Sequence, residues 1–232
     1  MSAAPDHPVE LQYAPSGPFS PEERAAVYRA IQTRRDVRRD FLPGPIPEPV
    51  LWRMLEAAHH APSVGLMQPW NFLLVTAPAQ KARIKAIFER ANAEAIAMFP
   101  PERRKAYAAL NLEGILQAPM GICVTCDASR AGAVALGATH MSGMAEFSTV
   151  CAIQNLWLAG RAEGVGVGWV SILDEEALKE VLGIPAQLRV VAYLCAGMVE
   201  QTMATPELEQ RGWRQRLPLE QLVYRDRWGE PA

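Results

Sequence analysis

The chain has 232 residues, of which 50% are hydrophobic and 21% are charged, and its formal net charge is −2. This is the composition of an ordinary folded domain, and its near-neutral charge gives no general reason to expect nucleic acid or an anionic membrane surface as a partner. No apolar run reaches the ~18 residues of a membrane helix, and four cysteines are too few for a disulfide framework, so we expect reduced thiols and a cytoplasmic protein.

The N-terminal part predicts an arm followed by two helices. Residues 1–20 carry acids and prolines without an apolar centre, and we expect a flexible arm before a single domain over residues 21–232. Ser20 begins a capping-box pattern, which predicts a helix that ends near Thr33. A second helix is predicted over Pro47–His60. The run "NFLLV" at 71–75 follows a turn-rich stretch and predicts a buried strand.

The rest of the chain predicts more helices than strands. The predicted elements are helices over Ala79–Phe99 and Glu102–Leu116, a core strand at 120–126, a long central helix at 141–161, a short strand at 167–173, a helix capped by Asp174 that ends at Gly183, and a core strand at 188–199. We expect the polar tail, 200–232, to wrap over a neighbouring surface. Helices and strands do not alternate, so the predicted class is α+β rather than a doubly wound parallel sheet.

Three patterns that resemble metal or cofactor sites have simpler explanations. Cys123 and Cys126 lie three residues apart on a predicted strand, so their side chains point to opposite faces. The histidines lack companions at ligand spacing, and we expect no metal. Gly164, Gly166 and Gly168 follow a helix and enter a strand, which is the reverse of a dinucleotide fingerprint and predicts a helix stop with a tight turn.

The stretch "QTRRDVRRDF", residues 32–41, gathers four arginines where the first helix is predicted to end. Each cation at the C-terminal end of a helix stabilises the helix by ~0.3–1 kcal/mol through its dipole. Two cations would be enough for this purpose, and the stretch has four. If the helix continued, Arg34 and Arg38 would lie one turn apart and could chelate one phosphate. Arg214 and Arg216 alternate in a predicted extended segment, which would aim both to one side. These arginines could bind a phosphate, or they could be surface charges without a ligand, and both interpretations stay open.

Three stretches together resemble the FMN-binding segments of the nitroreductase family. They are the arginine cluster at 34–41, "APSVGLMQPWNF" at 61–72 and "RQRLP" at 214–218, and they occur in the family's order. The resemblance implies a mixed, mostly antiparallel sheet flanked by helices, a long central helix, and an interlocked homodimer that holds FMN at the subunit interface. The FMN-binding residues that it implies are Arg34, Arg35, Asp36, Val37, Arg38, Pro62, Ser63, Gly65, Gln68, Ser171, Arg214 and Arg216.

Two departures from the family pattern indicate a specialised branch. Asp36 stands where serine or threonine is usual, and Leu66 where asparagine is common. With "GVGWVSIL" at 166–173, the chain more closely resembles the 5,6-dimethylbenzimidazole synthases. In that branch, the resemblance implies, reduced FMN is the substrate, and dioxygen fragments it to the lower ligand of cobalamin and erythrose 4-phosphate. Asp36 and Ser171 match its two functional polar residues, and we expect Asp36 to act as acid and base.

Other readings of the same residues stay open. Asp36 could form an ion pair with Arg35 or Arg39, and Ser171 could be a satisfied strand hydroxyl. The chain could be an NAD(P)H-dependent FMN oxidoreductase acting on nitro compounds, quinones or a corrin cobalt, or a flavin-storage protein without chemistry. A separate flavin reductase is a possible partner that supplies reduced FMN, and we expect the helices between Ala79 and Leu116 to form a lid.

Overall fold

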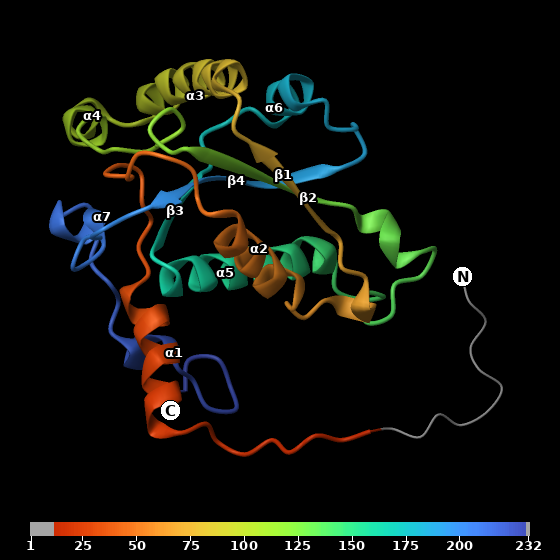
Figure 1. Ribbon diagram of the computed structural model, residues 1–232. Coiled ribbons are helices and arrows are strands. Elements are labelled where there is room, and N and C mark those ends of the chain that lie inside the picture. The colour runs from red at the N-terminus through yellow and green to blue at the C-terminus, as the bar shows by residue number, and fades with distance from the viewer. Residues whose placement is uncertain (1–11, 231–232) are drawn as a thin grey trace.

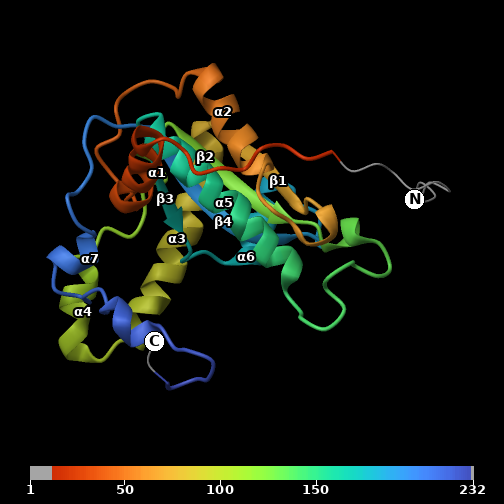
Figure 2. The ribbon, with the colours of Figure 1, turned by 90° about the horizontal axis from the view of Figure 1, so that it is seen from below.

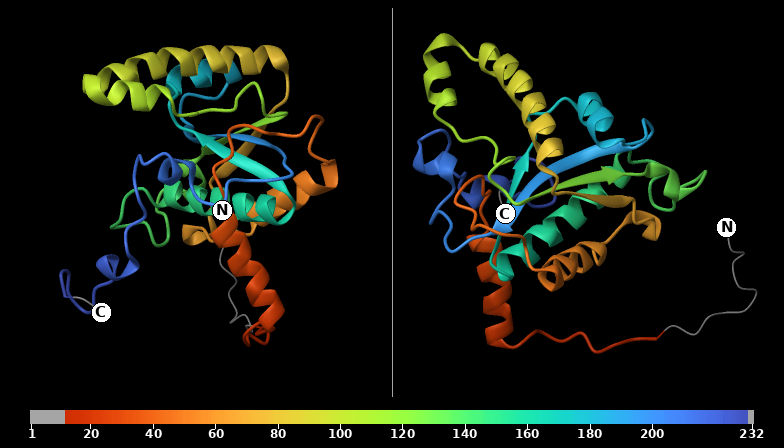
Figure 3. Two further views of the ribbon diagram at one scale, coloured as in Figure 1. Left: turned by 90° about the vertical axis from the view of Figure 1, so that its left-hand side faces the viewer. Right: turned by 45° about the horizontal axis from the view of Figure 1, so that its top comes forward.

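The computed structural model describes residues 12–230. Residues 1–11, which belong to the predicted arm, lie outside this range, while residues 12–20 form no helix or strand. Helix α1 (Pro21–Thr33) begins as predicted: the Ser20 hydroxyl accepts a hydrogen bond from the Glu23 amide, and the Glu23 carboxylate accepts one from the Ser20 amide. This helix buries none of its residues, and Figure 3 shows it projecting from the body of the protein.

The centre of the fold is an antiparallel sheet, which within residues 12–230 has four strands in the order β1-β2-β4-β3 (Figure 1). The strands are β1 (Trp70–Val75), β2 (Met120–Cys126), β3 (Val165–Val170) and β4 (Arg189–Met198). The strand at 71–75 was predicted to be buried, which is wrong because β1 lies at an edge, where Leu73 and Leu74 are 38% and 40% exposed. The sheet ladders are all antiparallel, and the parallel element is an isolated bridge from Asp36 to Val167.

Helices cover both faces of this sheet and confirm the α+β prediction. Helix α5 (Met144–Ala162) runs along one face with α2 (Glu48–His59) beside it, and the pair covers one core (Figure 2). On the other face, α3 (Pro78–Met98) and α6 (Glu175–Leu182) cover a second core (Figure 1). Helix α6 is capped by Asp174 and ends at Gly183, as predicted. No helix within residues 12–230 is long and apolar enough to cross a membrane.

The helix predicted over Glu102–Leu116 is shorter than expected, because α4 ends at Ala108 (Pro101–Ala108). The residues after it pair with Arg38 instead of continuing the helix. Asn111 accepts a hydrogen bond from Arg38 Nη1 through its carbonyl (3.0 Å) and donates one from Nδ2 to the Arg38 carbonyl (3.2 Å). A Cβ on Gly114 would lie 2.7 Å from the same Arg38 oxygen. These tertiary contacts override the helical pattern of the segment.

The first part of the tail, as far as Trp213, packs against the body of the protein, whereas residues 214–230 are exposed. The tail contains α7 (Glu207–Gln210) and a short 3-10 turn, η3 (Leu219–Leu222). Trp213 packs edge-on against Phe99 and Tyr107, with ring centroids 5.7 and 6.5 Å away. Trp213 thus fixes the start of the tail against α4, and the wrapping of the whole segment 200–232 stays a prediction.

Candidate active site

The free edge of β3 holds the aspartate of the arginine cluster. After Thr33 the chain leaves the helix, and the Val37 amide donates to the Val167 carbonyl at 3.0 Å. The Trp169 amide donates to Asp36 Oδ1, also at 3.0 Å. The helix therefore does not bring Arg34 and Arg38 one turn apart. The helix ends at Thr33 as predicted, so the condition for that spacing is not met, and the edge strand binds the segment as a short parallel bridge instead.

Two glycines of β3 make this close approach possible. A Cβ on Gly168 would lie 1.9 Å from the Val37 carbonyl oxygen, and a Cβ on Gly166 would lie 2.9 Å from a Val37 methyl group. Gly164, with φ of +77°, forms the predicted turn after α5. The prediction of a helix stop is thus confirmed for Gly164, whereas Gly166 and Gly168 serve the docking of the arginine segment.

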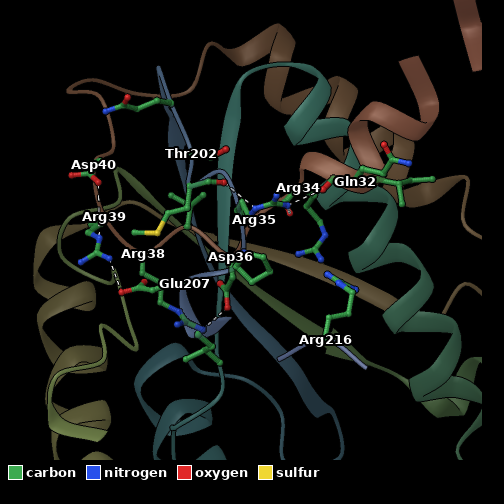
Figure 4. A pocket seen from close by; sticks show the side chains of 16 residues that line it. Gln32, Arg34, Arg35, Asp36, Arg38, Arg39, Asp40, Thr202, Glu207 and Arg216 are labelled. Carbon is green, nitrogen blue, oxygen red and sulfur yellow. Dashed lines mark hydrogen bonds and ion pairs between the residues drawn. The ribbon is translucent and has the colours of Figure 1, made fainter. Parts of the chain in front are cut away.

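A cavity of about 470 Å³ opens beside Asp36 (Figure 4). It lies between the end of α1, the arginine segment and the start of the tail. The structure brings six of the predicted FMN-binding residues to its wall, namely Arg34, Arg35, Asp36, Val37, Arg38 and Arg216. Glu207, Thr202 and Met203 also line it, although no pattern in the sequence pointed to these tail residues.

Three arginines of the cluster are already engaged by the protein. Arg38 pairs with Asp36 Oδ2, so the counterion of Asp36 is neither Arg35 nor Arg39. Arg39 pairs with Glu207 at 2.6 Å. Arg35 donates to backbone carbonyls, including that of Met203 at 2.9 Å, and so ties the tail to the cavity. These contacts stabilise the wall and neutralise part of its charge.

Arg34 and Arg216 are different, since within residues 12–230 their side chains form neither an ion pair nor a hydrogen bond, whereas Arg35, which also lacks an ion pair, is hydrogen-bonded. Figure 4 shows their guanidinium groups turned toward each other. In addition, Nε of Arg38 is buried without a hydrogen-bond partner among the described residues. Two like charges and an unused buried donor beside one cavity are features that an anion would satisfy.

Burial raises the pKa of Asp36, although 33% of its side chain is reached by solvent through the cavity. The positive charge of Arg38 and the hydrogen bond from the Trp169 amide act in the opposite direction and lower it. Desolvation is the larger effect, so the arginines of the cluster do not hold this carboxyl below its usual range. Asp36 is suited to take up and release a proton.

This raised pKa predicts a pH-dependent stability. The native state keeps the proton of Asp36 to higher pH than the unfolded chain does, so its contribution to stability is lost as the pH rises from about 4 through the native pKa. The free energy of unfolding of Asp36→Asn relative to the parent protein should therefore increase with pH across that window and then level off. Urea unfolding between pH 4 and 8 measures this difference, and a decrease with pH would contradict the assignment.

The loop that carries Ser63 and Gln68 lies away from the cavity. Ser63 Oγ accepts from the Gln68 amide at 3.1 Å, and the Val64 amide donates to Ser148 Oγ, near the start of α5, at 3.2 Å. By contrast, Thr33, beside the cavity, accepts from Arg161 near the end of α5, at 3.0 Å. Thirteen residues of helix separate those two α5 positions, which is about 20 Å. Within one protomer the loop and the arginines thus do not meet.

The remaining predicted residues lie near this loop or beyond the cavity wall. Gly65 has φ of +59°, and a Cβ there would lie 3.0 Å from the Leu136 carbonyl oxygen. The absence of a Cβ therefore allows this glycine to lie close to the backbone of Leu136. Pro62 is exposed on the same loop. Ser171 is exposed and lies just after β3, and its side chain forms no hydrogen bond within residues 12–230. The alternative that its hydroxyl is hydrogen-bonded within a strand is therefore not observed.

Arg214 does not line the cavity, although Arg216 does. The amides of Trp213 and Arg214 both donate to the Leu208 carbonyl, at 2.8 and 3.4 Å, so the chain turns just before this pair. Whether both arginines reach one flavin stays a prediction.

Comparison with known proteins identifies the family of the chain and its relatives. A model of the nitroreductase family matches residues 31–198. The 5,6-dimethylbenzimidazole synthase of Rhodospirillum rubrum is 44% identical over 204 residues, which cover 88% of this chain and 96% of that protein. The synthase of the same name from Rhodobacter capsulatus is 41% identical over 87% of this chain and 97% of that protein. In fold, the chain is similar to an iodotyrosine deiodinase bound to FMN and 3-iodo-L-tyrosine, with a TM-score of 0.67 and 20% identity over 87% of this chain and 98% of that one.

Proposed function

The chain belongs to the nitroreductase family, and within this family we propose that it is a 5,6-dimethylbenzimidazole synthase, which uses dioxygen to fragment reduced FMN into 5,6-dimethylbenzimidazole and erythrose 4-phosphate. Relatives that bear this name are 37–44% identical to it over 87–88% of its length. The observation that carries the proposal is the carboxylate of Asp36, fixed at a cavity that also presents two unpaired guanidiniums.

The residues at the cavity fit the phosphate of FMN. A phosphate dianion matches the paired charges of Arg34 and Arg216, and guanidinium forks bind it in a bidentate manner. Nε of Arg38 offers a further donor that the protein leaves unused. Reduced flavin, when bound, supplies the reactivity toward dioxygen itself, so the protein has to orient it, exclude water and move protons.

In this proposal Asp36 is the residue that moves protons. Its Oδ1 is fixed by the Trp169 amide and its Oδ2 by Arg38, which leaves the orientation of the carboxylate well defined. A serine at this position could not ionise near neutral pH, whereas a carboxyl with a raised pKa can donate and accept a proton there. We assign to Ser171 a hydrogen bond to the flavin, because its exposed hydroxyl has no partner within the described part of the protomer.

A homodimer explains why the loop with Ser63 and Gln68 contacts one end of α5 while the cavity lies near the other, at positions about 20 Å apart along the helix. In the proposed dimer this loop contacts the flavin that the arginines of the partner bind. Exposed apolar side chains on α5, Phe147 (56%) and Val150 (40%), provide surface for such an interface. Analytical ultracentrifugation tests the dimer. We place the reaction in the cytoplasm, where free cysteines are stable, and expect a separate flavin reductase to supply reduced FMN.

An aerobic product assay tests the proposed function directly. The purified protein is mixed with chemically reduced FMN in air, and the benzimidazole is measured by mass spectrometry. Its formation supports the proposal. Intact oxidised flavin together with rapid NADH-dependent reduction of a nitroaromatic would instead identify an FMN oxidoreductase, and flavin that stays bound and unchanged in both redox states would identify a storage protein.

Removal of the Arg216 charge tests the phosphate site. A charge-assisted hydrogen bond contributes about 1.5–3 kcal/mol, so Arg216→Gln should weaken FMN binding by about 10- to 150-fold. Riboflavin, which has no phosphate, should bind the variant and the parent equally well. Equilibrium dialysis measures both dissociation constants, and Arg90→Gln on the exposed face of α3 serves as the control. Equal losses for both flavins would show that Arg216 does not contact the phosphate.

A further inference from the structure

Arg34 is held in the cavity by an aromatic ring instead of a carboxylate. Its guanidinium carbon lies 4.7 Å from the centroid of the Trp157 ring. Arg38 and Arg39, in contrast, are fixed by Asp36 and Glu207. A carboxylate that fixes an arginine also neutralises it, whereas an indole face attracts the cation and leaves its full charge and its N–H groups available to an anion.

Trp157 also fixes the backbone beside Arg34. Its indole Nε1–H donates to the Arg35 carbonyl at 3.2 Å. The side chain is only 8% exposed, and it packs against Trp169 with ring centroids 6.4 Å apart. The amide of that same Trp169 donates to Asp36. One buried tryptophan on α5 thus contacts the Arg34 guanidinium, the backbone carbonyl of the next residue, Arg35, and Trp169, whose amide orients the carboxylate.

The end of α1 provides little other support for Arg34. Helix α1 buries none of its residues in the protomer, and Arg34 follows its last turn. There, Arg161 of α5 donates from Nε to the Thr33 hydroxyl at 3.0 Å. The side chains of α5 therefore determine where the end of α1, and with it Arg34, lies relative to the cavity.

We propose that Trp157 is a positioning residue, which orients Arg34 toward the phosphate of the flavin while leaving its charge unneutralised. This inference rests on the proposed function. It makes Trp157 a determinant of the preference for FMN over riboflavin, although its ring does not line the cavity itself. A tryptophan with a purely structural role would affect the binding of both flavins alike.

Substitution of the ring separates these two roles. Trp157→Leu removes the aromatic face and the indole donor, and Trp157→Phe keeps a weaker aromatic face without the donor. Equilibrium dialysis gives the dissociation constants of oxidised FMN and riboflavin for each protein. We expect the ratio of the riboflavin constant to the FMN constant to fall about 3- to 30-fold in Trp157→Leu and less in Trp157→Phe. Riboflavin binding should change by less than about twofold.

The controls keep the outcomes distinct. Trp228→Leu removes a tryptophan that is 89% exposed and lines no described cavity, and it should leave the ratio unchanged. Parallel losses of FMN and riboflavin binding in Trp157→Leu, or an unchanged ratio, would overturn the positioning role. If the parent protein itself does not prefer FMN to riboflavin, the proposed phosphate site fails, and that result is visible before any variant is made.

Discussion

Replacement of Asp36 by serine or asparagine is expected to lower the rate of benzimidazole formation by about 10²- to 10⁴-fold, the usual contribution of a general acid or base. The reason is that neither side chain can exchange a proton near neutral pH at the position that Asp36 Oδ1 and Oδ2 occupy. Binding of FMN should be largely kept, because Arg34 and Arg216, which we assign to the phosphate, make no ion pair with Asp36.

Single-turnover kinetics with reduced FMN and air measure this effect, with product quantified by mass spectrometry and FMN affinity by dialysis. Glu180→Gln, which changes an exposed carboxylate on α6, is the matched control and should react at the parent rate. An unaltered product yield in Asp36→Ser would remove Asp36 from the mechanism. A loss of FMN binding in proportion to the rate would instead give Asp36 a role in holding the flavin.

Gly168→Ala is expected to have the second large effect, although this residue carries no functional group. Its Cβ would lie 1.9 Å from the Val37 carbonyl oxygen, so the arginine segment must move away from β3. That movement breaks the hydrogen bond from the Trp169 amide to Asp36. We expect the free energy of unfolding to fall by about 1–3 kcal/mol and product formation to fall with the displacement of Asp36.

A graded series separates this clash from a general intolerance of β3 to alanine. At Gly166 a Cβ would meet side-chain methyl groups of Val37 and Val199, at 2.9 and 2.8 Å, which can shift more easily than a backbone oxygen. Gly166→Ala should therefore be milder, and Gly17→Ala, with nothing within 4 Å, should be neutral. Urea unfolding and the product assay rank the three variants. Equal stability of Gly168→Ala and the parent would show that the segment does not require this contact.

The local rules of the sequence determined most of the secondary structure. The capping box at Ser20, the Asp174 cap and the Gly183 stop predicted helix ends correctly, because each depends on residues that are neighbours in the chain. Apolar periodicity predicted α5 and the central strands for the same reason. The α+β class was also visible from the order of the predicted elements, whereas the role that we propose for Asp36 came from the resemblance to the nitroreductase family and stays a prediction.

Tertiary contacts decided the rest. Whether an arginine is free or paired depends on partners distant in sequence, such as Glu207 for Arg39 and Trp157 for Arg34, and no local pattern identifies these partners. The pKa of Asp36 depends on a balance between burial and neighbouring charge that only the packed structure fixes. The sequence by itself thus determined which chemical groups this protein has and roughly where its helices and strands begin and end. The packing of β3, α5 and the tail determined which of those groups line the cavity and which arginines have no carboxylate partner there. The reason is that burial and charge pairing depend on contacts between segments that are far apart along the chain.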